Sequence, residues 1–182
     1  MTLYRCFGWS SRAPATSAHG ALWVPREWQG DGRHDNPEAY GCLYLADREL
    51  SALVEQLAPF RTQPLQPALL RRGGLPLAVA SYELDGRAEL IDLDDTRVLV
   101  REALRPSAVA TRRREITQPQ ALRFHGERPG AAGLCWWSTF EATWANVTLF
   151  DRGVDGLALR DARELTVRDP AVLGAAEFLG LG

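Results

Sequence analysis

The histidines and serines of this 182-residue chain show no pattern typical of nucleophilic catalysis or metal binding. The Gly-x-Ser-x-Gly turn that presents a nucleophilic serine does not occur. The histidines have neither metal-ligand nor catalytic-triad spacing; they are His19, His34 and His125. No Walker loop or Gly-x-Gly-x-x-Gly turn opens a helix, so nucleotide binding in those two ways is not expected.

The three cysteines are far apart, form no Cys-x-x-Cys pair and each lie beside apolar residues; they are Cys6, Cys42 and Cys135. This spacing does not support a zinc site. We expect buried free thiols in a reducing cytoplasm. The sequence shows neither a signal peptide nor a run of about 20 apolar residues, so we expect a soluble, cytoplasmic protein.

The charge balance argues against general nucleic-acid binding. The chain carries 21 basic and 23 acidic residues, for a net charge of −2, and every basic residue is an arginine. A nucleic-acid binder normally has a basic surplus. The run Arg112-Arg113-Arg114 is a candidate phosphate patch, but a solvated loop or helix face explains it better.

Two segments combine charged, aromatic and small polar residues in an order that suggests a site. The first reads Asp31-Gly-Arg-His-Asp-Asn-Pro37, then Gly41-Cys-Leu-Tyr-Leu-Ala46, and is followed by a predicted helix that holds Glu55. The second reads Gly133-Leu-Cys-Trp-Trp-Ser-Thr139, then Asn146-Val-Thr-Leu-Phe-Asp151.

In this order the segments resemble the RES domain family, the toxin half of RES-Xre toxin–antitoxin pairs. That family has a Gly-Gly-Arg-Trp-Asn-Pro loop, a Tyr-x-Ala strand, a helix with an inward Glu, and a late strand ending in Ser before a Leu-Phe strand. The resemblance covers most of the chain, from near its start to the Leu-Phe-Asp segment. It places Arg33, Tyr44, Glu55 and Ser138 at the family's active-site positions.

Two departures from the family pattern are expected to reshape the pocket without removing a reactive group. The loop reads Asp31-Gly-Arg-His where the family has Gly-Gly-Arg-Trp. Trp136-Trp137 replaces the Tyr-Pro that more usually precedes the serine.

RES proteins are similar to ADP-ribosyltransferases, so the resemblance implies an NAD-binding cleft and cleavage of the nicotinamide–ribose bond. That cleavage builds positive charge on the ribose, which the Glu55 carboxylate would stabilise, unless it holds a ribose hydroxyl instead. The forked guanidinium of Arg33 suits the pyrophosphate. Tyr44 offers a ring for stacking and a hydroxyl, and Ser138 a small hydrogen-bonding group.

The same resemblance adds Trp137 and Asn146 as candidate NAD contacts. NAD enters as a substrate, and neither a metal nor a resident cofactor is expected. Nicotinamide leaves as a neutral molecule, so its departure needs no acid. Because the chain lacks lysine, any fixed positive charge on the pyrophosphate must come from an arginine, and Arg33 is the candidate.

Taken singly, these residues have simpler explanations. Arg33 fits a surface loop, Tyr44 the core side of a short strand, and Ser138 the end of a strand. Glu55 lies roughly opposite an apolar stripe that includes Leu53 and Leu57, as a solvated residue does. The functional interpretation requires the helix to pack that stripe on a sheet while its other side borders the cleft.

The first function hypothesis is therefore a growth-arresting toxin that degrades NAD, with water or phosphate receiving the ADP-ribose and an Xre-like antitoxin covering the cleft. The second keeps the site but transfers ADP-ribose to a protein or another acceptor. The third is a catalytically silent protein-interaction module.

Strand and helix patterns predict an α+β fold, with a mainly antiparallel central sheet and flanking helices, in one domain over residues 1–182. Strands are expected at 2–7, 42–46, 134–137 and 146–150, and a hairpin at 77–93 around the turn Asp85-Gly86. Residues 10–41 and 61–76 are rich in loop signals.

Three helices are predicted from their capping residues. Asp47 is expected to cap a helix over residues 48–58, and Thr117 a helix with Pro119 in its first turn. Asp169-Pro170 is expected to open a final helix that ends near residue 179. This helix lies in a C-terminal extension, residues 153–182, which docks on the domain or contacts a partner.

Overall fold

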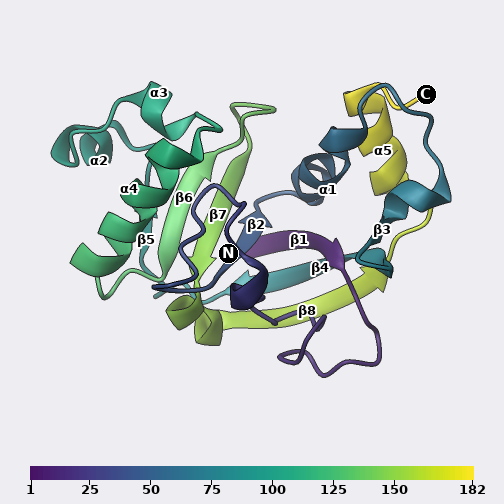
Figure 1. Ribbon diagram of the computed structural model, residues 1–182, viewed down its shortest axis with the longest axis horizontal. Helices are drawn as coiled ribbons and strands as arrows, with labels where there is room; N and C mark the ends of the chain where they lie inside the picture. Colours follow the sequence, from purple (N-terminus) through teal and green to yellow (C-terminus); the bar gives the residue numbers. More distant parts are fainter. The chain divides into compact units, whose positions relative to one another are not determined.

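A computed structural model describes residues 1–182 and shows an α+β fold with mainly antiparallel strand pairing, which confirms the predicted fold class (Figure 1). No helix is long and apolar enough to cross a bilayer. The chain divides into two compact units. Unit 1 holds residues 1–23, 46–83 and 158–182, and unit 2 holds residues 24–45 and 84–157.

The strands of unit 1 are built around a long antiparallel pair. β1 (Thr2–Gly8) runs against β4 (Leu75–Leu84) from the pair Thr2↔Glu83 to the pair Gly8↔Leu77. The short β3 (Arg71–Arg72) pairs antiparallel with β4, and β8 (Leu157–Glu164) also pairs with β4. On its other edge, β1 pairs with the last residue of β2 (Cys42–Ala46).

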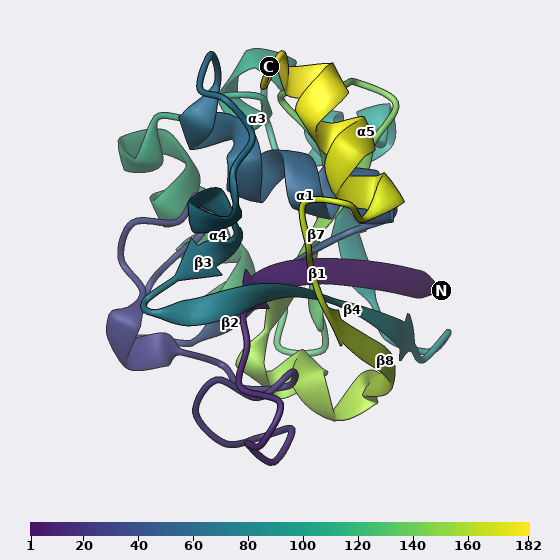
Figure 2. The same cartoon turned by 90° about the vertical axis from the view of Figure 1, so that its right-hand side faces the viewer.

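Two helices of unit 1 lie side by side, as Figure 2 shows. α1 (Glu49–Leu57) packs on β1 and against α5 (Pro170–Leu179). The predicted stripe of α1 is its buried face, since Leu53, Val54 and Leu57 are at most 1% exposed. Removing such side chains from water is the main favourable contribution to this packing.

The ends of α5 follow the predicted capping chemistry. Asp169 accepts a hydrogen bond from the backbone N–H of Ala171 at 3.0 Å, and Pro170 occupies the first helical position. Gly180 ends the helix in the left-handed conformation, with φ 68°. Arg163 of β8 forms ion pairs with Asp169 and with Glu49, the first residue of α1.

The predicted cap of α1 is wrong. Arg48 has an extended backbone and occupies the N-cap position, without a side-chain capping bond, so the helix starts one residue later than expected. The Asp47 carboxylate is then one residue too far from the helix to cap it, and one of its oxygens lies 3.4 Å from Nε of Arg48.

Unit 2 is organised around a second antiparallel pair. β6 (Gly133–Trp137) runs against β7 (Ala145–Phe150), and β5 (Leu90–Asp92) pairs parallel with β6. The helices α2 (Thr96–Arg101), α3 (Pro106–Val109) and α4 (Arg114–Glu127) belong to this unit. Side chains of α4, including Phe124, join Leu134, Trp136 and Phe150 in one buried apolar cluster.

Two further predictions in this region are wrong. Residues 77–93 do not form a hairpin, because β4 takes β1 as its partner while β5 pairs with β6. The turn at Asp85 exists, with a 3.0 Å hydrogen bond from Ala88, but it redirects the chain. α4 starts at Arg114, so Thr117 is inside the helix instead of at its cap.

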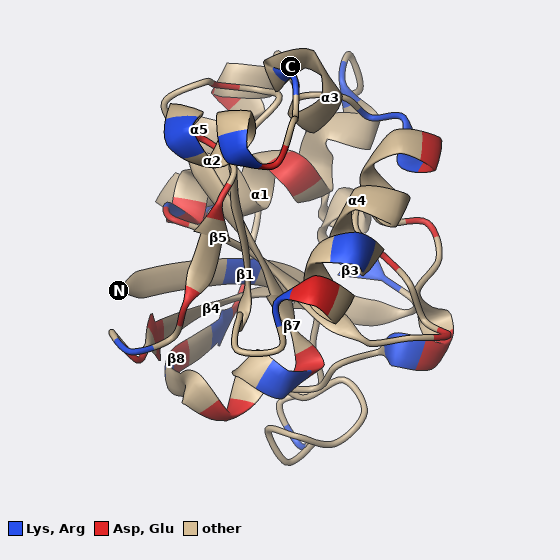
Figure 3. Cartoon of the chain, turned by 90° about the vertical axis from the view of Figure 1, so that its left-hand side faces the viewer, with Lys and Arg blue, Asp and Glu red and all other residues tan.

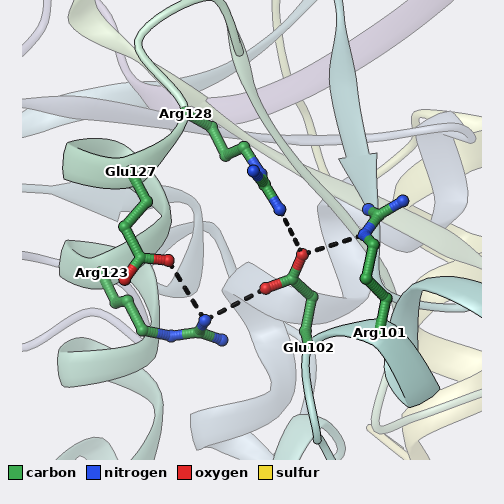
Figure 4. A network of polar contacts seen from close by, with 5 residues as sticks. All are labelled: Arg101, Glu102, Arg123, Glu127 and Arg128. Atoms are coloured by element: carbon green, nitrogen blue, oxygen red, sulfur yellow. Dashed lines mark hydrogen bonds and ion pairs between the residues drawn. The ribbon is translucent and has the colours of Figure 1, made fainter.

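An ion-pair cluster ties the end of α2 to α4 (Figure 4). The Glu102 carboxylate, whose side chain is 5% exposed, receives contacts from Arg101, Arg123 and Arg128 at 2.8–3.1 Å. These hydrogen bonds, that of Arg128 foremost, lower the pKa of Glu102 below its usual value. The cluster therefore holds Glu102 charged and fixes α2 against α4.

The three cysteines are free, as predicted, and Cys6 and Cys42 are buried while Cys135 is half-buried. Burial raises the pKa of both buried thiols, so they are protonated near neutral pH.

Candidate active site

The loop of residues 30–36, called the Arg33 loop below, is shaped by one buried carboxylate. Oδ2 of Asp35 accepts hydrogen bonds from the backbone N–H groups of Gly30 and Gly32, at 2.8 and 2.6 Å. A Cβ on Gly32 would lie 2.5 Å from both Asp35 Oδ1 and the Tyr44 hydroxyl oxygen. A larger residue at this position would therefore displace the Asp35 carboxyl group or the Tyr44 hydroxyl.

The Arg33 side chain is half-buried and held at several points. Its guanidinium carbon lies 4.3 Å from the centre of the Trp136 ring, a cation–π contact. Nη1 donates to the carbonyl oxygens of Val109, at 2.9 Å, and of Thr111. The Arg33 carbonyl accepts a hydrogen bond from the Thr117 hydroxyl at 2.5 Å. Both the backbone and the guanidinium of Arg33 are therefore fixed.

His34, where the family pattern has tryptophan, is buried at 3% exposure. Its Nδ1 lies 2.7 Å from the Thr148 hydroxyl, which also accepts a hydrogen bond from Trp136 Nε1 at 3.1 Å. Burial, reinforced by the nearby Arg33, lowers the pKa of His34 to about 3. The imidazole is therefore neutral near pH 7 and serves as part of a buried polar network.

The Tyr44 hydroxyl is used within the protein. It donates to Asp35 Oδ1 at 2.7 Å and accepts from the backbone N–H of His34 at 2.9 Å. Burial, followed by the neighbouring Cys42 and Asp35, raises its pKa well above the usual value. The hydroxyl is thus a neutral link between β2 and the Arg33 loop, while the ring is half-buried against the apolar cluster.

Ser138, Trp137 and Asn146 belong to the β6–β7 hairpin. The buried Ser138 donates its N–H to the Trp144 carbonyl at 2.8 Å, and its hydroxyl accepts from the Phe140 N–H at 3.1 Å. Asn146 is buried and lies directly opposite Trp136 in the strand register. Unit 2 therefore joins Arg33 to this hairpin through Trp136.

Glu55 is in unit 1, on α1, between the buried Val54 and the half-buried Gln56. Glu55 itself is half-buried, although the helical wheel alone indicates a fully solvated side chain. The other candidate residues all belong to unit 2.

The arginine run at the start of α4 is a solvated face. Arg113 pairs with Glu115 at 2.7 Å and Arg114 with Asp31 at 2.9 Å, and all four side chains are more than half exposed. Basic and acidic positions accordingly alternate on α4 in Figure 3. The phosphate-patch alternative therefore has less support than the solvated face.

The structure adds residues that the sequence did not single out. Asp35 in an Asp-Asn-Pro sequence resembles an ordinary turn residue, and Thr148 an ordinary strand residue. Gln118 of α4 donates to the carbonyl oxygens of Gly30 and Gly32, at 3.0 and 2.9 Å. The pattern that could have indicated Asp35 is its position two residues after the candidate Arg33.

The structure defines an α+β protein with a polar loop fixed beside a two-stranded hairpin, and comparison with known proteins gives its family. The RES domain family model matches residues 2–169, so the chain belongs to the RES domain family. Among solved structures, it is similar to a chain in the crystal structure of the M. tuberculosis MbcT–MbcA toxin–antitoxin complex. The two are 18% identical, with a TM-score of 0.62 over 99% of this chain and 87% of that one. No curated protein matches the sequence.

Proposed function

We propose that this protein is a RES-type toxin that consumes NAD by breaking the bond between nicotinamide and ribose. The observation that carries the proposal is the fixed position of Arg33, at the place where the family pattern has its loop arginine. A guanidinium held by carbonyl groups and by the Trp136 ring is oriented before substrate arrives. A guanidinium suits the pyrophosphate of a dinucleotide, because its planar fork matches the geometry of phosphate oxygens.

The proposed reaction breaks one bond and forms one. The bonding electron pair leaves with nicotinamide, which departs neutral, and positive charge develops on the ribose. The Glu55 carboxylate stabilises that charge. Water then bonds to the anomeric carbon and loses a proton, giving ADP-ribose; if phosphate attacks instead, the product carries phosphate at that carbon.

An antitoxin is the partner that this proposal implies. The similar M. tuberculosis chain was solved in a toxin–antitoxin complex, which supports a partner of that class for this chain. We expect an Xre-like antitoxin that blocks access to the site, in the cytoplasm where NAD is abundant enough for its loss to stop growth.

The decisive experiment measures nicotinamide release from NAD by the purified protein and by Glu55→Ala. Loss of an electrostatic or acid–base group at the reacting centre is expected to lower kcat/KM by about 10²–10⁴-fold. Glu177→Ala, which removes an exposed carboxylate from the other helix of unit 1, is the matched control and should retain full activity.

The products separate the alternatives. Free ADP-ribose indicates hydrolysis, and its anomeric phosphate ester, formed only when phosphate is added, indicates phosphorolysis. Label from NAD that appears on a macromolecule, with little free ADP-ribose, indicates the transferase. A folded wild-type protein that releases no nicotinamide and causes no growth arrest is the silent module, and this result refutes the proposal.

A further inference from the structure

Two side chains, Asp35 and Gln118, bind the backbone polar groups of both glycines in the Arg33 loop. The N–H groups of Gly30 and Gly32 donate to Asp35, and the carbonyl groups of the same two glycines accept from the side-chain amide of Gln118. Two glycines that would otherwise be conformationally free are thus fixed by two side chains.

Asp35 is a buried carboxyl group whose hydrogen-bond partners are all uncharged. It is 5% exposed, and its four donors are two backbone N–H groups, the Tyr44 hydroxyl and the Cys42 thiol, the last at 3.6 Å. A buried carboxylate costs considerable desolvation energy and is stable only when donors surround it. Both carboxyl oxygens of Asp35 are therefore hydrogen-bonded within the protein. This indicates a structural role for Asp35 and not a direct action on the substrate.

The same contacts converge on Arg33. Gly32, which precedes it, is held by Asp35 and Gln118, while the Arg33 carbonyl itself is held by Thr117. Asp35 also orders Tyr44, whose hydroxyl accepts from the His34 N–H that follows Arg33. A shift of this backbone would move the guanidinium away from the carbonyl groups and the Trp136 ring that orient it.

We propose that Asp35 and Gln118 are positioning residues that act through Arg33 and set how well the site binds NAD; this inference rests on the proposed function. Arg33 binds the pyrophosphate, which does not react, so loss of its position weakens substrate binding more than the chemical step. The effect appears mainly in KM.

The test combines Asp35→Asn and Gln118→Ala with Arg33→Ala in two double-mutant cycles on nicotinamide release. Asn has the shape of Asp but cannot accept from both the glycines and Tyr44, because one of its two polar groups is a donor. Asp35→Asn is expected to lower kcat/KM by about 10- to 100-fold, mostly through KM. Gln118→Ala is expected to lower kcat/KM in the same way but to a smaller degree. Because alanine favours helix, this variant still tests the positioning role if Asp35→Asn does not fold.

In the Arg33→Ala background, each substitution is expected to change kcat/KM by less than about threefold, because the guanidinium that these residues position is gone. A purely structural role would lower activity equally in both backgrounds. Two controls should leave wild-type kinetics unchanged. Glu38→Gln alters an exposed carboxylate in the adjacent segment, and Gln120→Ala truncates a half-buried glutamine of α4 that lacks these hydrogen bonds.

The outcomes distinguish the two proposals. If wild-type protein turns over NAD and the effects persist undiminished without Arg33, or fall on kcat alone, the positioning role is refuted while the proposed function stands. If folded wild-type protein releases no nicotinamide, the proposed function fails and this inference fails with it. Both proposals are supported if the losses in kcat/KM are additive when Asp35→Asn is combined with Glu55→Ala, and non-additive when Asp35→Asn is combined with Arg33→Ala.

Discussion

The helix pair α1–α5 and the Arg33 loop are stabilised by different interactions. The helix pair buries apolar faces, with Leu53, Val54 and Val172 all fully buried, and α5 has an acidic N-cap and a terminal glycine. The Arg33 loop has no regular structure and depends on polar contacts with residues far away in the sequence, such as Gln118.

This difference determines how each region responds to substitution. Burial of apolar surface is non-directional, so a lost methyl group in the helix pair lowers stability in proportion to the contacts removed. Hydrogen bonds in the loop fix direction, so their loss is expected to displace a functional group. Stability should therefore depend chiefly on the helix pair and substrate binding on the loop.

A large loss of stability is expected from Leu179→Ala in α5. Leu179 is buried at 6% exposure, and truncating such a residue lowers the free energy of unfolding by about 2–5 kcal/mol. Denaturant titration measures the loss, and nicotinamide release per folded molecule should stay at the wild-type level. If Leu179→Ala lowered the specific activity as much as Asp35→Asn does, the helix pair and the Arg33 loop would not differ in their effects on activity.

Much of unit 1 could be predicted because its signals are local. The stripe of α1 repeats with helical periodicity, and Asp169, Pro170 and Gly180 mark both ends of α5. The predicted turn at Asp85 is present, but the predicted hairpin is not. The strands on either side of the turn pair with strands elsewhere in the chain, β4 with β1 and β5 with β6. Local chemistry predicts a turn, whereas pairing depends on tertiary packing.

A second test uses pH to examine the loop network. His34 is neutral in the native state, with a pKa of about 3 against 6.5 for an ordinary histidine, so the unfolded chain binds the extra proton. The contribution of neutral His34 to the free energy of unfolding is complete above pH 6.5 and is lost as the pH falls toward 3. Between these values it contributes a slope of about 1.4 kcal/mol per pH unit.

Urea titrations at several pH values should show that His34→Gln flattens this dependence. His125→Gln is the matched control, since the half-buried His125 has a pKa lowered to a lesser extent, by burial first and by Arg152 second. Equal slopes for wild type and His34→Gln would mean that His34 is not buried and neutral in solution.

The candidate site was only partly predictable, because its key contacts link distant residues. The family resemblance indicates Arg33 and Tyr44, whereas no sequence pattern shows that Asp35 accepts hydrogen bonds from Tyr44 and from Gly32, the residue before Arg33. Thr117 illustrates the difficulty. Its sequence context indicates a helix cap, but its hydroxyl donates to the carbonyl of Arg33, 84 residues away.

The smallest expected effect separates two roles of one residue in the helix pair. Asp169 caps α5 and also pairs with Arg163, so Asp169→Ala removes both interactions and should cost about 1 kcal/mol, chiefly from the cap. Asn also caps helices well, so Asp169→Asn keeps the hydrogen bond to Ala171 while removing the charge. Because a partly exposed ion pair contributes little, Asp169→Asn should recover most of the lost stability in denaturant titrations. Equal losses for both variants would show instead that the ion pair with Arg163 dominates, and that directional polar contacts matter in the helix pair as they do in the Arg33 loop.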